Sequence, residues 1–216
     1  MASGTDPETL DAILITHEHT DHSGGLAAIA KRLNIPVYLS RLTAPAIAWG
    51  DYTPKIELFQ AGSRFVVGDI EVSSFTVPHD AADPVGFSLS AEGIRMAIAT
   101  DLGYLPDSIR FHLRGSDVLL LEANHDLEML KVGPYPWSVK QRVMGRNGHL
   151  SNDAACRFVR EDLDMRTSAL ILGHLSEHNN HPEIVRNAGH RALDGRTLFT
   201  RLFVADPRSA LEPIVY

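Results

Sequence analysis

Short apolar runs separated by polar turns predict an alternation of strands and helices along this chain. Ala12–Thr16 is an apolar run of strand length, typical of a strand covered on both faces. Further strands are predicted at Val37–Leu39, Lys55–Phe59, Arg64–Val67, Ile70–Val77, Val85–Leu89, Ile94–Ala99, Val118–Leu121, Ala169–Leu172 and Leu198–Val204. The segment Ala91-Glu92-Gly93 is typical of a hairpin turn between two of these strands.

Helical spacing predicts the other elements. In Gly24–Leu33 the apolar residues share one face, and Asn34 is expected to end the helix. The remaining predicted helices are Thr43–Trp49, which has the weaker pattern, Leu127–Lys131, Ser138–Met144, Asn152–Glu161 and Pro182–Ala192. This α/β mixture, with much antiparallel pairing, favours two sheets flanked by helices over a single parallel sheet.

Length and composition predict one globular domain spanning residues 1–216, with 44% hydrophobic and 22% charged residues. No stretch approaches the ~20 apolar residues that a membrane helix needs. The segment Met1–Glu8 lacks the basic and apolar regions of a secretory signal, and Cys156 is the one cysteine. These features predict a cytoplasmic protein that does not bind membranes.

The charge balance limits how the protein could bind nucleic acid. Twenty basic residues against 27 acidic ones give a net charge of −7. A protein that binds long nucleic acid through electrostatics alone is usually basic. A nucleic-acid substrate would therefore require local contacts, or positive charge supplied by metal ions.

The candidate chemistry begins in the segment Thr16–His22, directly after the first predicted strand. Three imidazoles and a carboxylate fall within six positions, from His17, His19, Asp21 and His22. These are ligands that suit zinc, manganese or iron. His17 and His19 can face one ion, and Asp21 and His22 can face a second. The alternative is a solvated polar turn.

Three more candidate ligands, His79, Asp101 and His174, each follow an apolar strand. Strand ends place side chains on one rim of a sheet, so residues distant in the chain can converge there. Each of the three could alone be an ordinary turn residue. Beside the histidine-rich segment, we interpret all three as metal ligands.

These residues resemble the metallo-β-lactamase superfamily. His17, His19, Asp21 and His22 match its HxHxDH signature, and His79, Asp101 and His174 match its later histidine, bridging aspartate and final histidine. Over about residues 10–210 the chain resembles the YycJ/WalJ (VicX) group in particular. The segments that carry this likeness are Pro78–Ala81, Ala99–Tyr104, Leu121–Asp126, Gly133–Trp137, Gly148–Asn152 and His174–Asn180.

The resemblance implies an αββα sandwich, a metal-dependent phosphodiesterase and a 5′→3′ DNA exonuclease activity. It implies two divalent ions, zinc or manganese, with iron as a further option. One ion would be bound by His17, His19 and His79, the other by Asp21, His22 and His174, with Asp101 as the bridge. His149 resembles the extra histidine that lies near the scissile phosphate in phosphodiesterase members.

The resulting hypothesis is hydrolysis of DNA by a metal-bound hydroxide. Asp21 or Asp101 would orient the water, and His149 would protonate the departing oxygen. Two divalent ions add four positive charges, which would bring the formal net charge from −7 to −3. The alternatives are hydrolysis of another ester or thioester, an inactive metal-binding regulatory protein, and, for His149, a polar residue that merely flanks a helix.

Supporting roles are predicted with open alternatives. Glu18 and Asp80 are candidates to orient metal-binding imidazoles. The pairs Arg142/Arg146 and Arg157/Arg160 could guide a phosphate backbone or belong to solvated helix faces, and Tyr135 and Trp137 could stack on a base or pack in the core. Cys156 is expected to be a buried core residue.

One feature departs from the resemblance. Members of the group have two or more strands before the HxHxDH motif, whereas here the motif begins at residue 17. The resemblance therefore implies a fold without its first N-terminal strands and with an unpaired strand edge. We expect the ligands to be retained and the structure that supports them to be weaker.

Overall fold

The computed structural model describes residues 6–196 and 199–215. Residues 1–5, which were examined for a secretory signal, and Leu198, the predicted start of the last strand, lie outside the described residues. No helix within the described ranges has the length and apolar character needed to cross a membrane.

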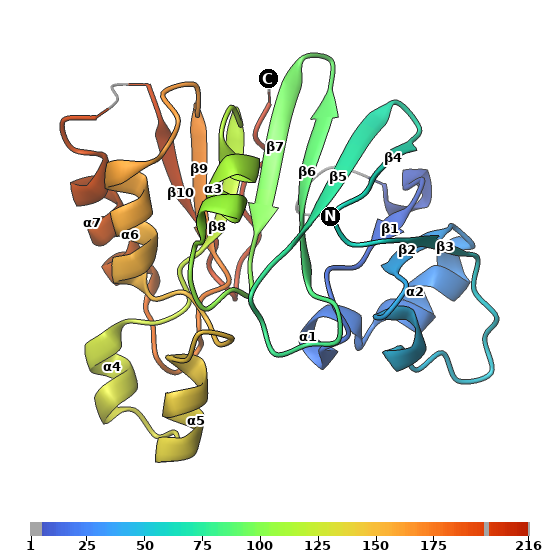
Figure 1. The fold of residues 1–216 in the computed structure, drawn as a ribbon, viewed down its shortest axis with the longest axis horizontal. Coiled ribbons are helices and arrows are strands. Elements are labelled where there is room, and N and C mark those ends of the chain that lie inside the picture. The colour runs from blue at the N-terminus through green and yellow to red at the C-terminus, as the bar shows by residue number, and fades with distance from the viewer. Residues whose placement is uncertain (1–5, 197–198, 216) are drawn as a thin grey trace.

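Two β-sheets form the centre of the fold (Figure 1). The smaller sheet is parallel and has the order β1-β2-β3, with β1 (Ile13–Leu14), β2 (Val37–Ser40) and β3 (Ile56–Phe59). The larger sheet has seven strands in the order β10-β9-β8-β7-β6-β5-β4. Its strands are β4 (Arg64–Val67), β5 (Ile70–Thr76), β6 (Val85–Ala91), β7 (Ile94–Ala99), β8 (Val118–Glu122), β9 (Ala169–Gly173) and β10 (Arg201–Val204). The predicted two-sheet architecture is confirmed.

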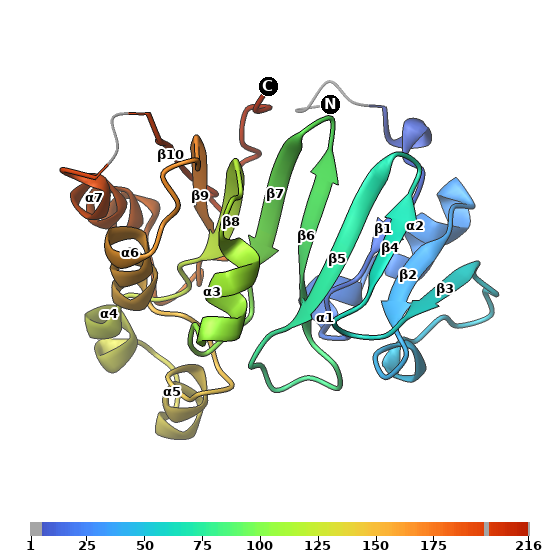
Figure 2. The same ribbon diagram turned by 45° about the horizontal axis from the view of Figure 1, so that its top comes forward.

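Helices flank the two sheets (Figure 2). They are α1 (Thr20–Ser23), α2 (Leu26–Leu33), α3 (Asp107–Leu113), α4 (Leu127–Val132), α5 (Trp137–Val143), α6 (Asn152–Glu161) and α7 (Pro182–Leu193), with 3₁₀ turns at Pro7–Thr9 and Ala44–Ala46. α4 and α5 lie beyond the strand ends of the large sheet (Figure 2). α2 packs on the small sheet through Leu26 and Ala30. α3, α6 and α7 pack on the large sheet, where Cys156 is buried as predicted.

The two sheets pack against each other through an aromatic layer. Phe59 stands 5.1 Å from Phe65 and 6.0 Å from Phe87 between ring centroids. Leu14 and Tyr38 of the small sheet pack on the same cluster. This layer fixes the small sheet, and with it the segment that follows β1, relative to the large sheet.

Local sequence signals explain most element boundaries. Asn34 ends α2 in a left-handed conformation with φ 53°. Glu92 and Gly93 both have positive φ, 50° and 80°, as a two-residue hairpin of the I′ type requires. Ser151 caps α6 by accepting a hydrogen bond from the Ala154 N–H.

The structure adds the unpredicted helices α1 and α3 and corrects one helix prediction. Helix α3 was not predicted, because its buried apolar residues Ile109 and Leu113 make only a single i, i+4 pair. The helix predicted at Thr43–Trp49 is wrong beyond the turn Ala44–Ala46, since the backbone is already extended at Ile47.

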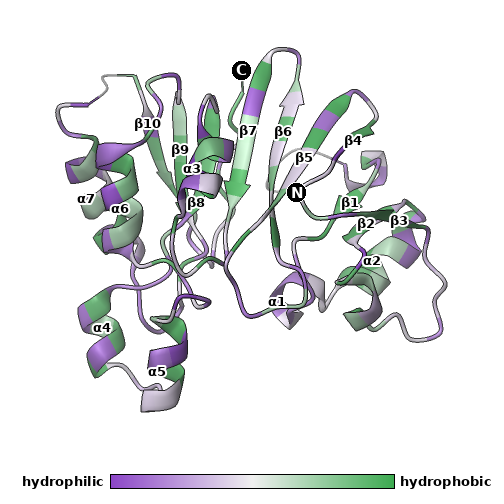
Figure 3. Ribbon diagram, in the orientation of Figure 1, coloured by the Kyte–Doolittle hydropathy of each residue, from purple (hydrophilic) through white to green (hydrophobic). Residues whose placement is uncertain are grey.

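The direction of the strands decides where polar side chains gather. β7, β8 and β9 are parallel neighbours, so their carboxyl ends share one edge of the large sheet. Figure 3 shows how β7 changes from a hydrophilic band near its start to hydrophobic residues toward this edge. Residues that follow these strands therefore meet one another and the segment that follows β1.

Candidate metal centre

All seven predicted ligands converge at this edge. Sets of donor atoms within 4.8 Å of one another are formed by His17, His19 and His79, by His17, His22 and Asp101, and by Asp21, His22 and His174. Asp101 and His174 adopt left-handed backbone conformations, with φ 57° and 58°. Such conformations are uncommon for side-chain-bearing residues and cluster at functional sites.

The first set consists of imidazole nitrogens that face one another. His19 Nδ1 lies 3.1 Å from His17 Nε2 and 3.2 Å from His79 Nε2. A tetrahedral zinc ion with nitrogens at about 2.0–2.1 Å would space its ligands by about 3.3 Å. Burial and the neighbouring His22 lower the pKa of His17 to about 3, which keeps this imidazole neutral at pH 7. The spacing and the neutral nitrogen fit a divalent cation.

Asp101 joins the first set to the second. Its side chain is 3% exposed, with Oδ2 3.3 Å from His22 Nε2 and Oδ1 3.6 Å from His174 Nε2. Oδ1 also lies 3.8 Å from His79 Nε2. Oδ2 is buried and forms no hydrogen bond within the described residues. A buried carboxylate whose two oxygens face imidazoles of both sets, His22 through Oδ2 and His79 and His174 through Oδ1, fits a bridging cation ligand.

Asp21 lies on the exposed side of the second set. Its Oδ2 is 3.5 Å from His22 Nε2 and 3.7 Å from His174 Nε2. Its side chain is 65% exposed, in contrast with Asp101. Asp21 therefore reaches both the cluster and the adjoining solvent.

Glu122 is the central residue that the sequence analysis missed. Its Oε1 accepts hydrogen bonds from His149 Nδ1 at 2.8 Å and His174 Nδ1 at 2.7 Å. Its Oε2 accepts from the backbone N–H groups of Leu102 and Leu150, each at 3.0 Å. Although burial alone would lower the pKa of His174, Glu122 raises it to about 9. The sequence signal for Glu122 was its place at the end of an apolar strand, β8, just as Asp101 follows the apolar strand β7.

His149 lies within the cluster. Its ring centroid is 5.1 Å from that of His79 and 5.5 Å from that of His174. Because Nδ1 donates to Glu122, Nε2 is the nitrogen left to meet a ligand. The alternative that His149 merely flanks a helix does not account for this placement.

A cavity of about 340 Å³ opens beside the cluster. Asp21, His149 and His174 line it, together with Tyr135 of the segment before α5. The Tyr135 ring stands edge-on to His178, with centroids 5.9 Å apart. The cavity therefore joins the metal-ligand cluster to an aromatic wall.

The predicted supports of the imidazoles need correction. Glu18 Oε1 accepts a hydrogen bond from the Ala82 N–H at 2.8 Å instead of orienting a histidine. His79 Nδ1 donates to the Gly148 carbonyl at 3.1 Å. Asp80 lies on the other side of that ring, 3.6 Å from Nε2, and pairs with Arg142. The Gly148 carbonyl thus orients the His79 ring by accepting a hydrogen bond from its Nδ1, as Glu122 orients the His174 ring.

The predicted arginine pairs and the two aromatic residues do not all have the same role. Some lie near the cluster, and others lie on solvated surface. Arg142 lies near the cluster through Asp80, whereas Arg146 lies 4.3 Å over the Tyr104 ring. Arg157 and Arg160 are exposed on α6, which favours a solvated face. Core packing is wrong for Trp137, whose residue surface is 64% exposed.

We expect Gly148→Ala to destabilise the site. An added Cβ would lie 2.2 Å from both the Arg142 and Val143 carbonyl oxygens, so the loop whose carbonyl binds His79 would have to move. The expected loss is about 1–3 kcal/mol of unfolding free energy, as for other overpacking changes, measured by denaturant titration. Gly25→Ala is the control, because its Cβ meets no atom within 4 Å; equal stability of the two variants would contradict the argument.

Comparisons with known proteins agree with this geometry. The Beta-lactamase superfamily domain matches residues 2–175. The chain is 36% identical over 188 residues to exodeoxyribonuclease YycJ of Bacillus anthracis, covering 86% of this chain and 71% of that protein. It is 38% identical over 183 residues to exodeoxyribonuclease WalJ of Streptococcus pneumoniae serotype 2, covering 82% and 68%.

A solved structure shows the same fold. The metallo-β-lactamase fold protein YhfI of Bacillus subtilis superposes with a TM-score of 0.71 at 17% identity, over 92% of this chain and 76% of that one. The family match, the fold and the clustered histidines and aspartates agree. The chain belongs to the metallo-β-lactamase superfamily and is a hydrolase of that fold.

Proposed function

We propose that this chain is a dinuclear metal-dependent phosphodiesterase that removes nucleotides from DNA. The observation that carries the proposal is the position of His149, within the same cluster as Asp101 and His174. A proton donor beside a metal centre is what cleavage of a phosphodiester needs at the departing oxygen. The two exodeoxyribonuclease relatives support DNA as the substrate.

The donor sets support two ion sites. His17, His19 and His79 would bind one ion, Asp21, His22 and His174 the other, and Asp101 both. Divalent ions bound there supply Lewis-acid chemistry, lowering the pKa of water and stabilising the oxygens of an in-line displacement. Zinc and manganese both suit these ligands, and iron is a further option.

The chain's own groups control the protons. Glu122 accepts a hydrogen bond from the Nδ1–H of His149, which leaves Nε2 to carry the proton that the departing oxygen would receive. Burial alone would lower the pKa of His149, but the bond to Glu122 raises it above that of a free imidazole, so the ring holds its proton more strongly. Asp21, at the solvent side of the cavity, is placed to orient the attacking water.

Substrate would enter through the cavity beside the cluster. Tyr135 offers a ring face or edge to a base, and Asn124, Ser176 and Asn179 add polar groups to the same walls. Arg142 lies nearby through its contact with Asp80 and could meet the phosphate backbone. These contacts are local, as the net charge of −7 requires.

A nuclease assay tests the proposal. End-labelled single- and double-stranded DNA and RNA are incubated with the chain and zinc, manganese or iron(II), beside a chromogenic phosphodiester and a thioester. We expect shortening of DNA and hydrolysis of the phosphodiester but not of the thioester. Thioester hydrolysis alone would indicate a different hydrolase, and failure to bind any divalent ion would indicate a non-catalytic protein.

We expect His149→Ala to retain its metal while the rate falls by about 10²–10⁴-fold, the usual contribution of general acid–base catalysis. His149 donates to Glu122 but is not among the seven ligands, so the ions would keep their donors. Metal content and the cleavage rate are measured on the same preparation. His190→Ala, on α7, is the control; an unchanged rate in His149→Ala would contradict the assigned role.

A further inference from the structure

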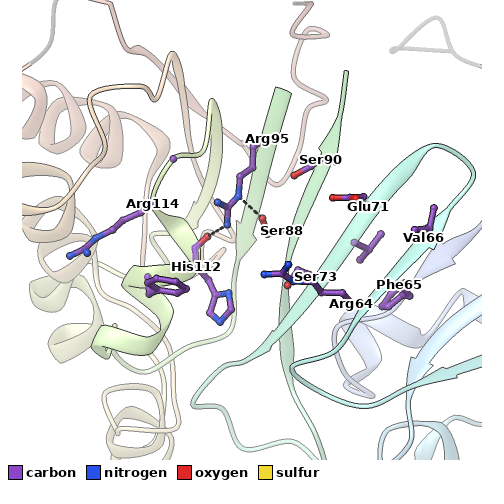
Figure 4. A pocket seen from close by; sticks show the side chains of 13 residues that line it. Arg64, Phe65, Val66, Glu71, Ser73, Ser88, Ser90, Arg95, His112 and Arg114 are labelled. Carbon is purple, nitrogen blue, oxygen red and sulfur yellow. Dashed lines mark hydrogen bonds between the residues drawn. The ribbon is translucent and has the colours of Figure 1, made fainter. Parts of the chain in front are cut away.

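A second, larger hollow of about 690 Å³ lies on the face of the seven-stranded sheet turned away from the small sheet. Its floor is formed by β4 to β7, and α3 forms one wall (Figures 1 and 4). It shares no lining residue with the metal centre or with the cavity beside it. It is therefore a separate feature of the fold.

The strand register produces this floor. Arg64 pairs with Ser73, and Ser73 pairs with Ser88 on the next strand. One step along, Ser90 pairs with Arg95. Side chains that are directly opposite share a face of the sheet. The hydroxyls of Ser73, Ser88 and Ser90 therefore form the floor between an arginine on β4 and an arginine on β7, together with the carboxylate of Glu71, which lies opposite Ser90. These polar side chains leave the space above the strands open, and an apolar segment would not pack favourably against them.

The two arginines are presented differently. Arg95 is fixed, since Nε donates to Ser88 Oγ at 2.8 Å and Nη2 to the His112 carbonyl at 2.9 Å. Arg64 forms no ion pair with any described residue, and its guanidinium extends across the floor toward Arg95 and His112 (Figure 4). Burial first, and then the charges of Arg95 and Arg64, lower the pKa of His112, in keeping with the approach of both guanidinium groups to that ring.

The charge of the hollow is opposite to that of the whole chain. Arg64, Arg95 and Arg114 line it against one carboxylate, Glu71, whereas the chain carries −7. Guanidinium groups bind phosphate through charge-assisted, often bidentate hydrogen bonds, and hydroxyls add further donors. Phe111, 68% exposed, also lines the hollow and presents an aromatic ring that stands edge-on to His112. An anion that carries an aromatic ring matches this combination.

We propose that this hollow is a binding site for a nucleoside phosphate, with the phosphate between Arg64 and Arg95 over the serine floor and the base against Phe111. The volume lies within the range of about 300–1,000 Å³ usual for small-molecule sites. The site goes beyond the proposed nuclease function and does not depend on it. Its ligand could be a free nucleotide or the phosphorylated end of a strand, which share this chemistry.

Calorimetric titration of the metal-loaded chain tests the proposal. The probes are thymidine 5′-monophosphate and a 5′-phosphorylated pentathymidylate with phosphorothioate linkages, which resist hydrolysis. For Arg64→Ala we expect about tenfold weaker binding of at least one probe, the scale of one charge-assisted hydrogen bond. Arg32→Ala, an exposed arginine on α2, is the matched control and should bind as the wild type does.

Further arms separate this site from the metal centre. Phe111→Ala should weaken binding of the nucleotide but not of inorganic phosphate, because only the base meets the ring. The melting temperature of Arg64→Ala should equal that of the wild type, which shows that the variant is folded. Weakening for the monophosphate identifies a free nucleotide, and weakening for the oligonucleotide alone identifies a strand end. Identical affinities of wild type, Arg64→Ala and Arg32→Ala for both probes would overturn the proposal.

Discussion

Asp101→Asn is expected to lose bound metal and to lower the rate of phosphodiester cleavage by about 10³-fold or more, because a catalytic ion contributes several kcal/mol to transition-state stabilisation. Asp101 lies between the imidazoles of His22, His79 and His174. Asparagine keeps the shape of the side chain but removes the charge and one of the two oxygens. Neither ion would then have its shared carboxylate ligand.

Asparagine tests the role of the carboxylate better than alanine does, because it tolerates the left-handed backbone conformation of residue 101. Asp101 has φ 57°, a conformation that asparagine tolerates and alanine adopts at a cost of about 1–2 kcal/mol. Asp101→Ala should lose metal and activity too, but its loss includes that strain. Metal content by atomic spectroscopy and the cleavage rate are compared with Asp69→Asn in an exposed turn. Full metal content and wild-type activity in Asp101→Asn would end the assignment of Asp101 as the bridge.

The predictable part of this site depends on short sequence distances or on strand ends. His17, His19, Asp21 and His22 are confined to six positions, so any local backbone leaves them as neighbours. Asp101 and His174 were predictable because β7, β8 and β9 are parallel and end at one edge. Both inferences need only the order and direction of strands.

The residue that connects these groups could not be found that way. The four partners of Glu122 lie 20, 27, 28 and 52 positions away, and two of them are backbone N–H groups that carry no sequence signal. The position of Glu122 at the end of β8 is a signal that it lies at this edge, as Asp101 does, but it does not indicate which groups the carboxylate binds. Helix α3 was missed for a similar reason, because its two buried apolar residues, Ile109 and Leu113, form a single pair that defines no period.

Glu122→Gln is expected to reduce both stability and activity. All four partners of Glu122 are hydrogen-bond donors, and its side chain is fully buried. Glutamine supplies one acceptor oxygen, so its NH₂ group must face two donors, either the two imidazoles or the two backbone N–H groups. Breaking a buried charged network of this kind costs about 3 kcal/mol or more.

For a chain of this length, that loss corresponds to a melting temperature lower by about 10 °C. His149 and His174 would also lose the acceptor that sets their tautomer and orientation, and removing such outer partners lowers metal affinity or activity by about 10–100-fold. Calorimetric melting, metal titration and the cleavage rate are measured together. Glu161→Gln, at the exposed end of α6, is the matched control. Because the same carboxylate bonds both imidazoles and the two backbone segments, stability and activity should fall together; a stable variant with normal metal affinity would show that Glu122 does not orient these histidines.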